Sequence, residues 1–274
     1  MIRNVGDIPV YYEEYGKGKA ILCIHGRGVD HRLMTGCLEP VFTQIQGYRR
    51  IYLDLPGMGN TPSAEWIHNP HDMLEVISGF INEIIPDENF LIAGESAGGR
   101  LALGLIHDMK ERIDGVLMIC PAVPYNGDNP VRSIIHKSEE LDPNGNDSDL
   151  KTFLDIAVIA TPEIYDKFKN KVLPGIKAAD QEFLSNQYTG GYDPDFENES
   201  KNIIFDKPTC ILAGKQDHWV GYAGAYELLN RFPRATFAVL DCAGHNLQFE
   251  NVPLFNQHLK DWIWRLELTC TSRL

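Results

Sequence analysis

The stretch "LIAGESAGGRLALGLI", residues 91–106, contains a change of pattern from which the architecture can be worked out. An apolar run ends at Gly94, a serine follows two residues later, and an apolar pattern with helical spacing begins at once. Glycines at 94, 98 and 99 surround Ser96 and leave room for a sharp turn from a strand into a helix. The pattern therefore predicts a serine in a strained backbone conformation at the apex of that turn.

Short apolar runs recur along the chain, and segments with helical spacing separate them. The strand-like runs are 20–26, 49–57, 89–96, 115–121, 209–217 and 235–245, with a weaker alternating run at 9–16. Helical spacing is found in 69–85, 96–112, 221–232 and 251–266. Because the runs are apolar on both faces and alternate with helices, they predict an α/β fold with a mostly parallel central sheet covered by helices on both faces.

One long segment, residues 122–206, interrupts this alternation. It is rich in Pro, Asn and Gly, contains several short helical patterns, and separates two strands that should be consecutive. We predict that it forms a helical cap, or lid, inserted after the sixth strand and lying over the C-terminal edge of the sheet. Residues 1–121 and 207–274 then form the core domain.

Composition and charge exclude several classes of function. The net charge is −13 and no basic stripe occurs, so nucleic acid is not an expected partner. The sequence contains no run of 18 apolar residues, so it predicts no membrane span. The N-terminus has no signal-peptide pattern and the six cysteines are scattered, which predicts a cytoplasmic protein with free thiols. The expected partner is a small-molecule substrate, and the oligomeric state is left open.

Three side chains carry the predicted chemistry. Ser96 occupies the centre of Gly94-Glu95-Ser96-Ala97-Gly98, the G-x-S-x-G pattern of a nucleophile elbow, although a glycine-rich turn with an incidental serine is the alternative. A serine hydroxyl needs a base, and His245 follows the last strand-like run at the same sheet edge. Asp217 ends the preceding run and is the predicted orienting carboxylate. Asp241 also ends a strand but is expected to cap a turn.

Backbone donors for a developing oxyanion are expected in the glycine-containing loop His25-Gly26-Arg27-Gly28. We predict that the N–H groups of Arg27 and Ala97 form the oxyanion hole. Four residues are predicted to line the substrate pocket, namely His25, Gly26, Glu95 and Trp219. No metal ligand set and no cofactor motif is identified.

The chain resembles the α/β-hydrolase superfamily over nearly its whole length. The resemblance is carried by "YYEEYGKGKAILCIHGRG", "YLDLPGMGNTP", "GESAGG", "LAGKQDHWV" and "AGHNLQFENVPLF", and by the chain order Ser, Asp, His. It implies an antiparallel first hairpin, a lid domain and a hydrolase without a cofactor. Dehalogenases and epoxide hydrolases of the superfamily have an Asp at the elbow, so Ser96 argues against both. Many relatives have an aromatic residue or His where Met58 stands, which leaves that wall of the pocket undetermined.

These observations predict a serine hydrolase that cleaves a carboxylic ester of a small to medium neutral substrate through an acyl-enzyme. The cap carries 16 acidic residues and 8 Lys/Arg, a net charge of −8, and this is the basis for expecting neutral substrates. Three alternatives remain open: a C–C bond hydrolase of a diketone-like substrate, a thioesterase, and a ligand-binding protein that retains the triad with little turnover.

Overall fold

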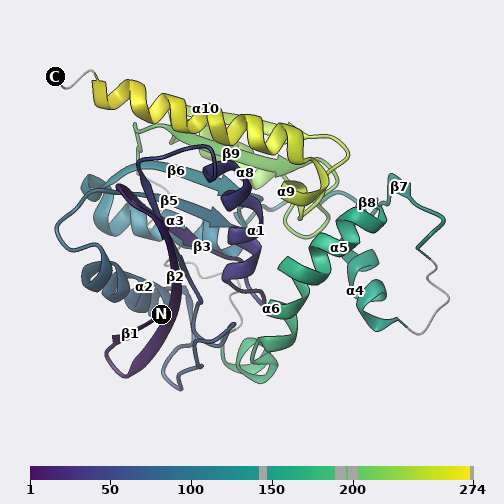
Figure 1. Ribbon diagram of the computed structural model, residues 1–274, viewed down its shortest axis with the longest axis horizontal. Helices are drawn as coiled ribbons and strands as arrows, with labels where there is room; N and C mark the ends of the chain where they lie inside the picture. Colours follow the sequence, from purple (N-terminus) through teal and green to yellow (C-terminus); the bar gives the residue numbers. More distant parts are fainter. Residues whose placement is uncertain (142–146, 189–195, 197–202, 272–274) are drawn as a thin grey trace.

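An eight-stranded sheet forms the centre of the molecule, and helices cover both of its faces (Figure 1). The computed structural model describes residues 1–141, 147–188, 196 and 203–271. The strands lie in the order β1-β2-β4-β3-β5-β6-β9-β10. Their bounds are β1 (Ile2–Val5), β2 (Ile8–Gly16), β3 (Lys19–Ile24), β4 (Tyr48–Leu53), β5 (Phe90–Glu95), β6 (Ile113–Ile119), β9 (Thr209–Gly214) and β10 (Ala235–Leu240).

Strand direction follows the predicted pattern. The hairpin β1–β2 and the pair β2–β4 are antiparallel, and all other pairs in this sheet are parallel. Strands β5 and β9 are buried along their full length because helices cover them on both sides. The carboxyl ends of the parallel strands therefore meet at one edge of the sheet. The α/β fold with a mostly parallel sheet is confirmed.

Each face of the sheet has its own apolar layer. Helices α2 (Pro70–Ile84) and α3 (Ala97–Met109) bury one layer, with Phe80 and Leu101 among its members. Helices α1 (His31–Phe42) and α10 (Val252–Thr271) bury the other, which contains Phe255 and Trp262. None of the described helices has the length and apolar character required to cross a bilayer.

Several elements differ from the sequence prediction in extent. Strand β1 and helix α1 lie outside the predicted runs, and α1 contains Pro40, which obscures its helical pattern. The predicted helix 221–232 is shorter, consisting of α8 (Ala223–Glu227) and the 3₁₀ turn η3 (Leu228–Asn230). A similar 3₁₀ turn, η1 (Lys110–Arg112), follows α3, and the short helix α9 (Leu247–Glu250) precedes α10.

The insertion after β6 is mainly helical in its described parts. It contains α4 (Ser148–Ile156), α5 (Pro162–Lys171), α6 (Leu173–Ala178) and the π-helical turn η2 (Phe183–Gln187). A two-residue parallel pair, β7 (His136–Lys137) with β8 (Ile159–Ala160), was not predicted. Helices α4, α5 and α6 form a group beside the core in Figure 1, and α5 contacts α1 and α9. The buried aromatic side chains of Phe153, Tyr165 and Phe168 join the apolar layer of α1.

The turn between β5 and α3 depends on two close backbone approaches. A Cβ atom at Gly94 would lie 2.5 Å from the carbonyl oxygen of Gly98, and a Cβ atom at Gly98 would clash with the carbonyl oxygen of Ile24. The first turn of α3 therefore packs directly on the ends of β5 and β3. Ser96, at the apex, has φ 51° and ψ −116°, the strained conformation that the glycines predict.

We expect Gly98→Ala to lower the free energy of unfolding by about 2–4 kcal/mol, because the new methyl group meets rigid backbone and not a movable side chain. Denaturant unfolding followed by circular dichroism measures the change. Gly36→Ala is the comparison variant, since the three atoms nearest to its Cβ would belong to the Lys171 side chain, at 2.7–3.0 Å, and not to backbone. Because alanine also favours the helix, a smaller loss of stability is expected. Equal destabilisation by the two changes would contradict the packing argument.

Candidate active site

Ser96 lies between β5 and α3 with its backbone held on both sides. Its N–H donates to the carbonyl of Ile119 at 2.9 Å. Its carbonyl accepts from the N–H groups of Arg100 at 3.1 Å and Ala122 at 3.0 Å. These bonds fix a half-buried serine at the carboxyl edge of the sheet in a conformation that L-residues rarely adopt.

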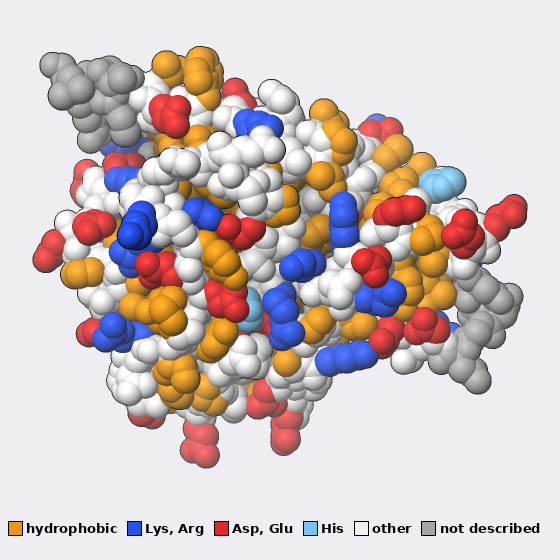
Figure 2. Space-filling model, viewed as in Figure 1, with side chains coloured by type: hydrophobic (Ala, Val, Ile, Leu, Met, Phe, Trp, Pro, Cys, Tyr) orange, Lys and Arg blue, Asp and Glu red, His pale blue; other side chains and the backbone are white. Residues whose placement is uncertain are grey.

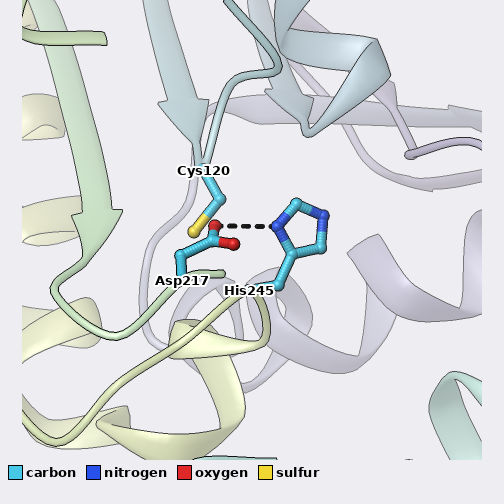
Figure 3. Close-up of side chains that lie close together, drawn as sticks. All are labelled: Cys120, Asp217 and His245. Carbon is cyan, nitrogen blue, oxygen red and sulfur yellow. Dashed lines mark hydrogen bonds and ion pairs between the residues drawn. The ribbon is translucent and has the colours of Figure 1, made fainter. Parts of the chain in front are cut away.

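The structure brings the three predicted side chains into one hydrogen-bonded chain. His245 Nε2 lies 2.9 Å from Ser96 Oγ, and His245 Nδ1 lies 2.8 Å from Asp217 Oδ2. Figure 3 shows the imidazole turned edge-on toward the carboxylate of Asp217. With Nδ1 protonated toward the carboxylate, Nε2 is free to accept the serine proton.

Asp217, the residue predicted to orient His245, is fully buried behind it. Its Oδ1 accepts from the N–H groups of Trp219 at 3.0 Å and Val220 at 3.2 Å, which leaves Oδ2 for His245. Burial opposes ionisation, but His245 and these two amides outweigh it and lower the pKa of Asp217. Asp217 is therefore held as an ionised hydrogen-bond acceptor.

Asp241, the other candidate acid, lies outside this chain of contacts. It follows β10 on the surface, where its Oδ1 accepts from Gln216 Nε2 at 2.8 Å. The hydrogen bond with Gln216 lowers its pKa. Among the described contacts, Asp241 forms no hydrogen bond or ion pair with His245.

Cys120 is a neighbour of the site that the sequence does not single out. It follows β6 with φ 42°, and its Sγ donates to the carbonyl of Gly244 at 3.5 Å. Burial, together with Asp217, raises the pKa of this thiol, so it remains protonated beside the carboxylate (Figure 3). The only signal in the sequence is its place directly after a predicted strand. A cysteine at the end of a strand is equally consistent with a small apolar side chain packed in the core.

Two groups of side chains in the described residues have the donor atoms of a metal site. One is Cys120, Asp217 and His245, and the other is Asp30, His31 and Asp54. In each group a histidine is already hydrogen-bonded to an aspartate, at 2.8 Å and 2.7 Å respectively. Asp30 is also ion-paired with Arg32. We therefore interpret both groups as hydrogen-bond networks and assign no metal to them.

The loop of residues 25–28, predicted to provide an oxyanion donor, lies beside the elbow. A Cβ atom at Gly26 would lie 3.0 Å from the Cβ of Ser96. The N–H of Arg27 and the N–H of Ala97 form no hydrogen bond with any acceptor in the described part of the chain. Arg27 is exposed and Ala97 is half-buried, and the assignment of their N–H groups to an oxyanion hole stays a prediction.

His25 and Met58 hold that loop in place. His25 is fully buried, and its Nδ1 donates to the carbonyl of Gly26 at 2.7 Å while its Nε2 accepts from the N–H of Leu55 at 3.0 Å. Met58 Sδ accepts the N–H of Gly28 at 3.2 Å. The prediction of His25 as a pocket residue is therefore revised, because both ring nitrogens are occupied within the protein and the ring supports the loop from below. Met58 supports the same loop through its hydrogen bond from Gly28.

The other predicted pocket residues lie in different environments. Trp219 is 53% exposed, and its ring lies 5.2 Å from the ring of His245. It lines a cavity of about 410 Å³ together with Arg100, Ala122, Val123, Pro124, Tyr125 and Val220. Gly26 and Glu95 are buried, and Glu95 is only 2% exposed. Glu95 is therefore too deeply buried to form part of an exposed pocket wall.

Glu250, which the sequence analysis did not select, connects the His245 loop with the inserted segment. Its Oε2 accepts the N–H of Gly244 at 2.6 Å, and its Oε1 accepts the N–H of Val158 at 2.6 Å and of Ile159 at 3.3 Å. Burial raises the pKa of this carboxyl, and the three amides oppose the rise. One half-buried side chain therefore positions the residue before His245 against β8.

The sequence and the fold of the chain are similar to those of several known proteins. The model of the alpha/beta hydrolase family matches residues 21–256. The 2-hydroxy-6-oxo-6-(2'-aminophenyl)hexa-2,4-dienoic acid hydrolase of Metapseudomonas resinovorans is 22% identical over 261 residues, which cover 90% of this chain and 85% of that protein. The pimeloyl-[acyl-carrier protein] methyl ester esterase of Legionella pneumophila (strain Paris) is 22% identical over 258 residues, covering 93% and 99%. The crystal structure of an α/β superfamily hydrolase from Oenococcus oeni PSU-1 has a TM-score of 0.86 and 29% identity, covering 94% and 96%.

We expect Asp217→Asn to slow the reaction of Ser96 with a fluorophosphonate by about 10³–10⁴-fold, because an amide stabilises the wrong tautomer of His245. The second-order rate of labelling, measured by mass spectrometry, gives the effect. Asp241→Asn removes a carboxylate from the same edge without touching the imidazole and is expected to cost less than about tenfold. The reverse ranking would show that Asp241 is the partner of His245.

Proposed function

The chain belongs to the α/β hydrolase family, and we propose that within it the protein is a serine hydrolase of carboxylic esters. The observation that supports this most directly is the relay Asp217–His245–Ser96, with separations of 2.8 Å and 2.9 Å, at a strained turn. The N–H groups of Arg27 and Ala97 form no hydrogen bond with a described acceptor. A nucleophile, a base, an orienting acid and an oxyanion hole are the parts that acyl transfer requires.

The first half of the proposed reaction forms an acyl-enzyme. Ser96 Oγ attacks the acyl carbon while its proton passes to His245 Nε2, and Asp217 stabilises the resulting imidazolium. The N–H groups of Arg27 and Ala97 hold the negative oxygen of the tetrahedral intermediate. One such donor contributes about 3 kcal/mol in hydrolases where it has been removed.

The second half releases the products. The tetrahedral intermediate collapses, and His245 returns the proton to the oxygen of the departing alcohol. Water then attacks the acyl carbon while His245 accepts its proton, and the bond between that carbon and Ser96 Oγ breaks as His245 returns the proton to Oγ. The acyl group leaves as a carboxylic acid, and Ser96 regains its hydroxyl proton.

We propose that residues 122–206 act as the cap of this site and bound the substrate cavity. Tyr125 and Trp219 line the cavity of about 410 Å³, a size suited to small or medium substrates. Ser96 is not among the lining residues, but Ala122, whose N–H donates to the Ser96 carbonyl, is one of them. The negative charge of the cap is partly compensated on its own surface, since Asp149 pairs with Lys177 and Asp155 with Arg132. Figure 2 likewise shows acidic and basic side chains interspersed on the visible face.

A C–C bond hydrolase is the second candidate, and one comparison favours it. The named substrate of the Metapseudomonas resinovorans relative is a 2-hydroxy-6-oxo dienoic acid, a compound without an ester, and the similarity extends over 90% of this chain. The same three side chains serve both reactions, with a carbon leaving group in place of the alcohol oxygen.

A fluorophosphonate is expected to label Ser96 alone, and Ser96→Ala is expected to fold normally and to lose activity by about 10⁴-fold or more. A panel of p-nitrophenyl esters of increasing acyl length, with a conjugated ketone beside it, then identifies the bond cleaved. Faster turnover of the ketone than of every ester would select the C–C hydrolase. Labelling without turnover of any member would select a binding protein.

Neutral esters are expected to react faster than acyl-CoA of the same acyl length, because the cap is net negative and repels an anion. The gap in kcat/KM should narrow as salt rises, since screening reduces the repulsion over about 8 Å at physiological ionic strength. A preference for acyl-CoA at both low and high salt would identify the protein as a thioesterase.

A further inference from the structure

We propose that Glu95 is a positioning residue that binds the imidazolium of His245 on its Nε2 side, opposite Asp217, and so sets the basicity of the base. This inference rests on the proposed function, in which His245 accepts the proton of Ser96. In this proposal Glu95 acts on His245 and does not line the substrate pocket.

The geometry places a second carboxylate against the reactive nitrogen. Glu95 is the last residue of β5, directly before Ser96. Its Oε1 lies 3.5 Å from His245 Nε2, the atom that is 2.9 Å from Ser96 Oγ. Because Glu95 is 2% exposed and His245 6% exposed, water screens this contact only weakly.

The second oxygen of Glu95 faces the oxyanion loop. A Cβ atom at Gly26 would clash with Oε2, so a glycine is required there for the carboxyl to occupy this site. Glu95 is therefore held between the base and the loop that carries the Arg27 N–H. Any movement of the carboxyl would disturb both.

The chemical consequence concerns the charge that appears during the reaction. When Ser96 attacks, the imidazole becomes a cation whose Nδ1 faces Asp217 and whose Nε2 side faces Glu95. The carboxylate of Asp217 shares its charge with two backbone amides. Glu95 has one such amide, that of Gly26, and its ionised form strengthens His245 as a base.

The charges around Glu95 and His245 support a stronger base when Glu95 is ionised. Burial raises the pKa of Glu95 to about 7, with His245 opposing the rise. Burial lowers the pKa of His245, but Asp217, Glu95 and the more distant Glu250 outweigh it and raise it to about 9. Among the other neighbours, Cys120 and Cys37 are buried thiols whose own pKa values are raised, so they stay neutral. Burial lowers the pKa of His218, and the charge of His245 adds to this shift.

The test is the pH dependence of Ser96 labelling by a fluorophosphonate, since labelling requires neutral His245. In the wild type, the labelling rate should rise with pH and reach half its plateau above the ordinary histidine pKa of about 6.5. Glu95→Gln removes the charge and keeps the shape, so the midpoint should fall by about one pH unit. An unchanged midpoint with a merely slower plateau would assign Glu95 a structural role and overturn the proposal.

Two further variants separate charge from packing. Glu95→Asp moves the carboxylate away from Nε2 by one methylene, so the midpoints should fall in the order wild type, Asp, Gln. This comparison decides the matter even if Glu95→Gln does not fold, because an Asp midpoint equal to that of the wild type overturns the proposal. Glu250→Gln is the control for loss of another buried carboxylate, and it should shift the midpoint less than Glu95→Gln.

The same experiment distinguishes this inference from the proposed function. If the wild type is not labelled at Ser96, or if its labelling is independent of pH, the serine–histidine mechanism itself is wrong. If the wild type is labelled with the expected rise and the Glu95 variants share its midpoint, the mechanism stands and only the role of Glu95 is refuted.

Discussion

The left-handed backbone of Ser96 is the constraint on which the rest of the site depends. Such a conformation costs about 1–3 kcal/mol for a residue with a side chain. Hydrogen bonds from the Ser96 N–H to β6 and from Arg100 and Ala122 to its carbonyl offset that cost. Gly98 allows the first turn of α3 to rest on the end of β3. The serine, the loop of residues 25–28 and the start of α3 therefore lie together at one corner of the sheet.

Buried carboxyls organise the electrostatics around this corner. Asp217 is ionised because His245 and two amides compensate its burial. Glu95 has fewer compensating partners, and burial raises its pKa. Glu250 accepts three backbone N–H groups and connects the loop before His245 with β8 of the inserted segment. A displacement of that segment would therefore reach the His245 loop through the hydrogen bonds of Glu250.

The fold class and the residues that converge at the sheet edge could be predicted from local patterns. Strands that are apolar on both faces indicate a parallel sheet, and in such a sheet every strand's carboxyl end lies at the same edge. Ser96, Asp217 and His245 each follow a strand in the sequence, so their approach in space was a consequence of topology. Glycines around Ser96 indicated its strain because only small residues permit the turn. Helix α1, by contrast, was not predicted, because Pro40 inside it interrupts the helical pattern of the sequence.

Tertiary structure alone decided what surrounds these residues. In the sequence His25, Glu95 and Cys120 are single letters beside a strand end, and their side chains could face solvent, pocket or core. Packing turned His25 under the oxyanion loop, Glu95 toward His245 Nε2, and the Cys120 thiol into the neighbourhood of Asp217. Periodicity identifies the elements and their shared edge because it reflects local backbone geometry. Side-chain direction and burial, which set the pKa values, depend on contacts between segments distant in the chain.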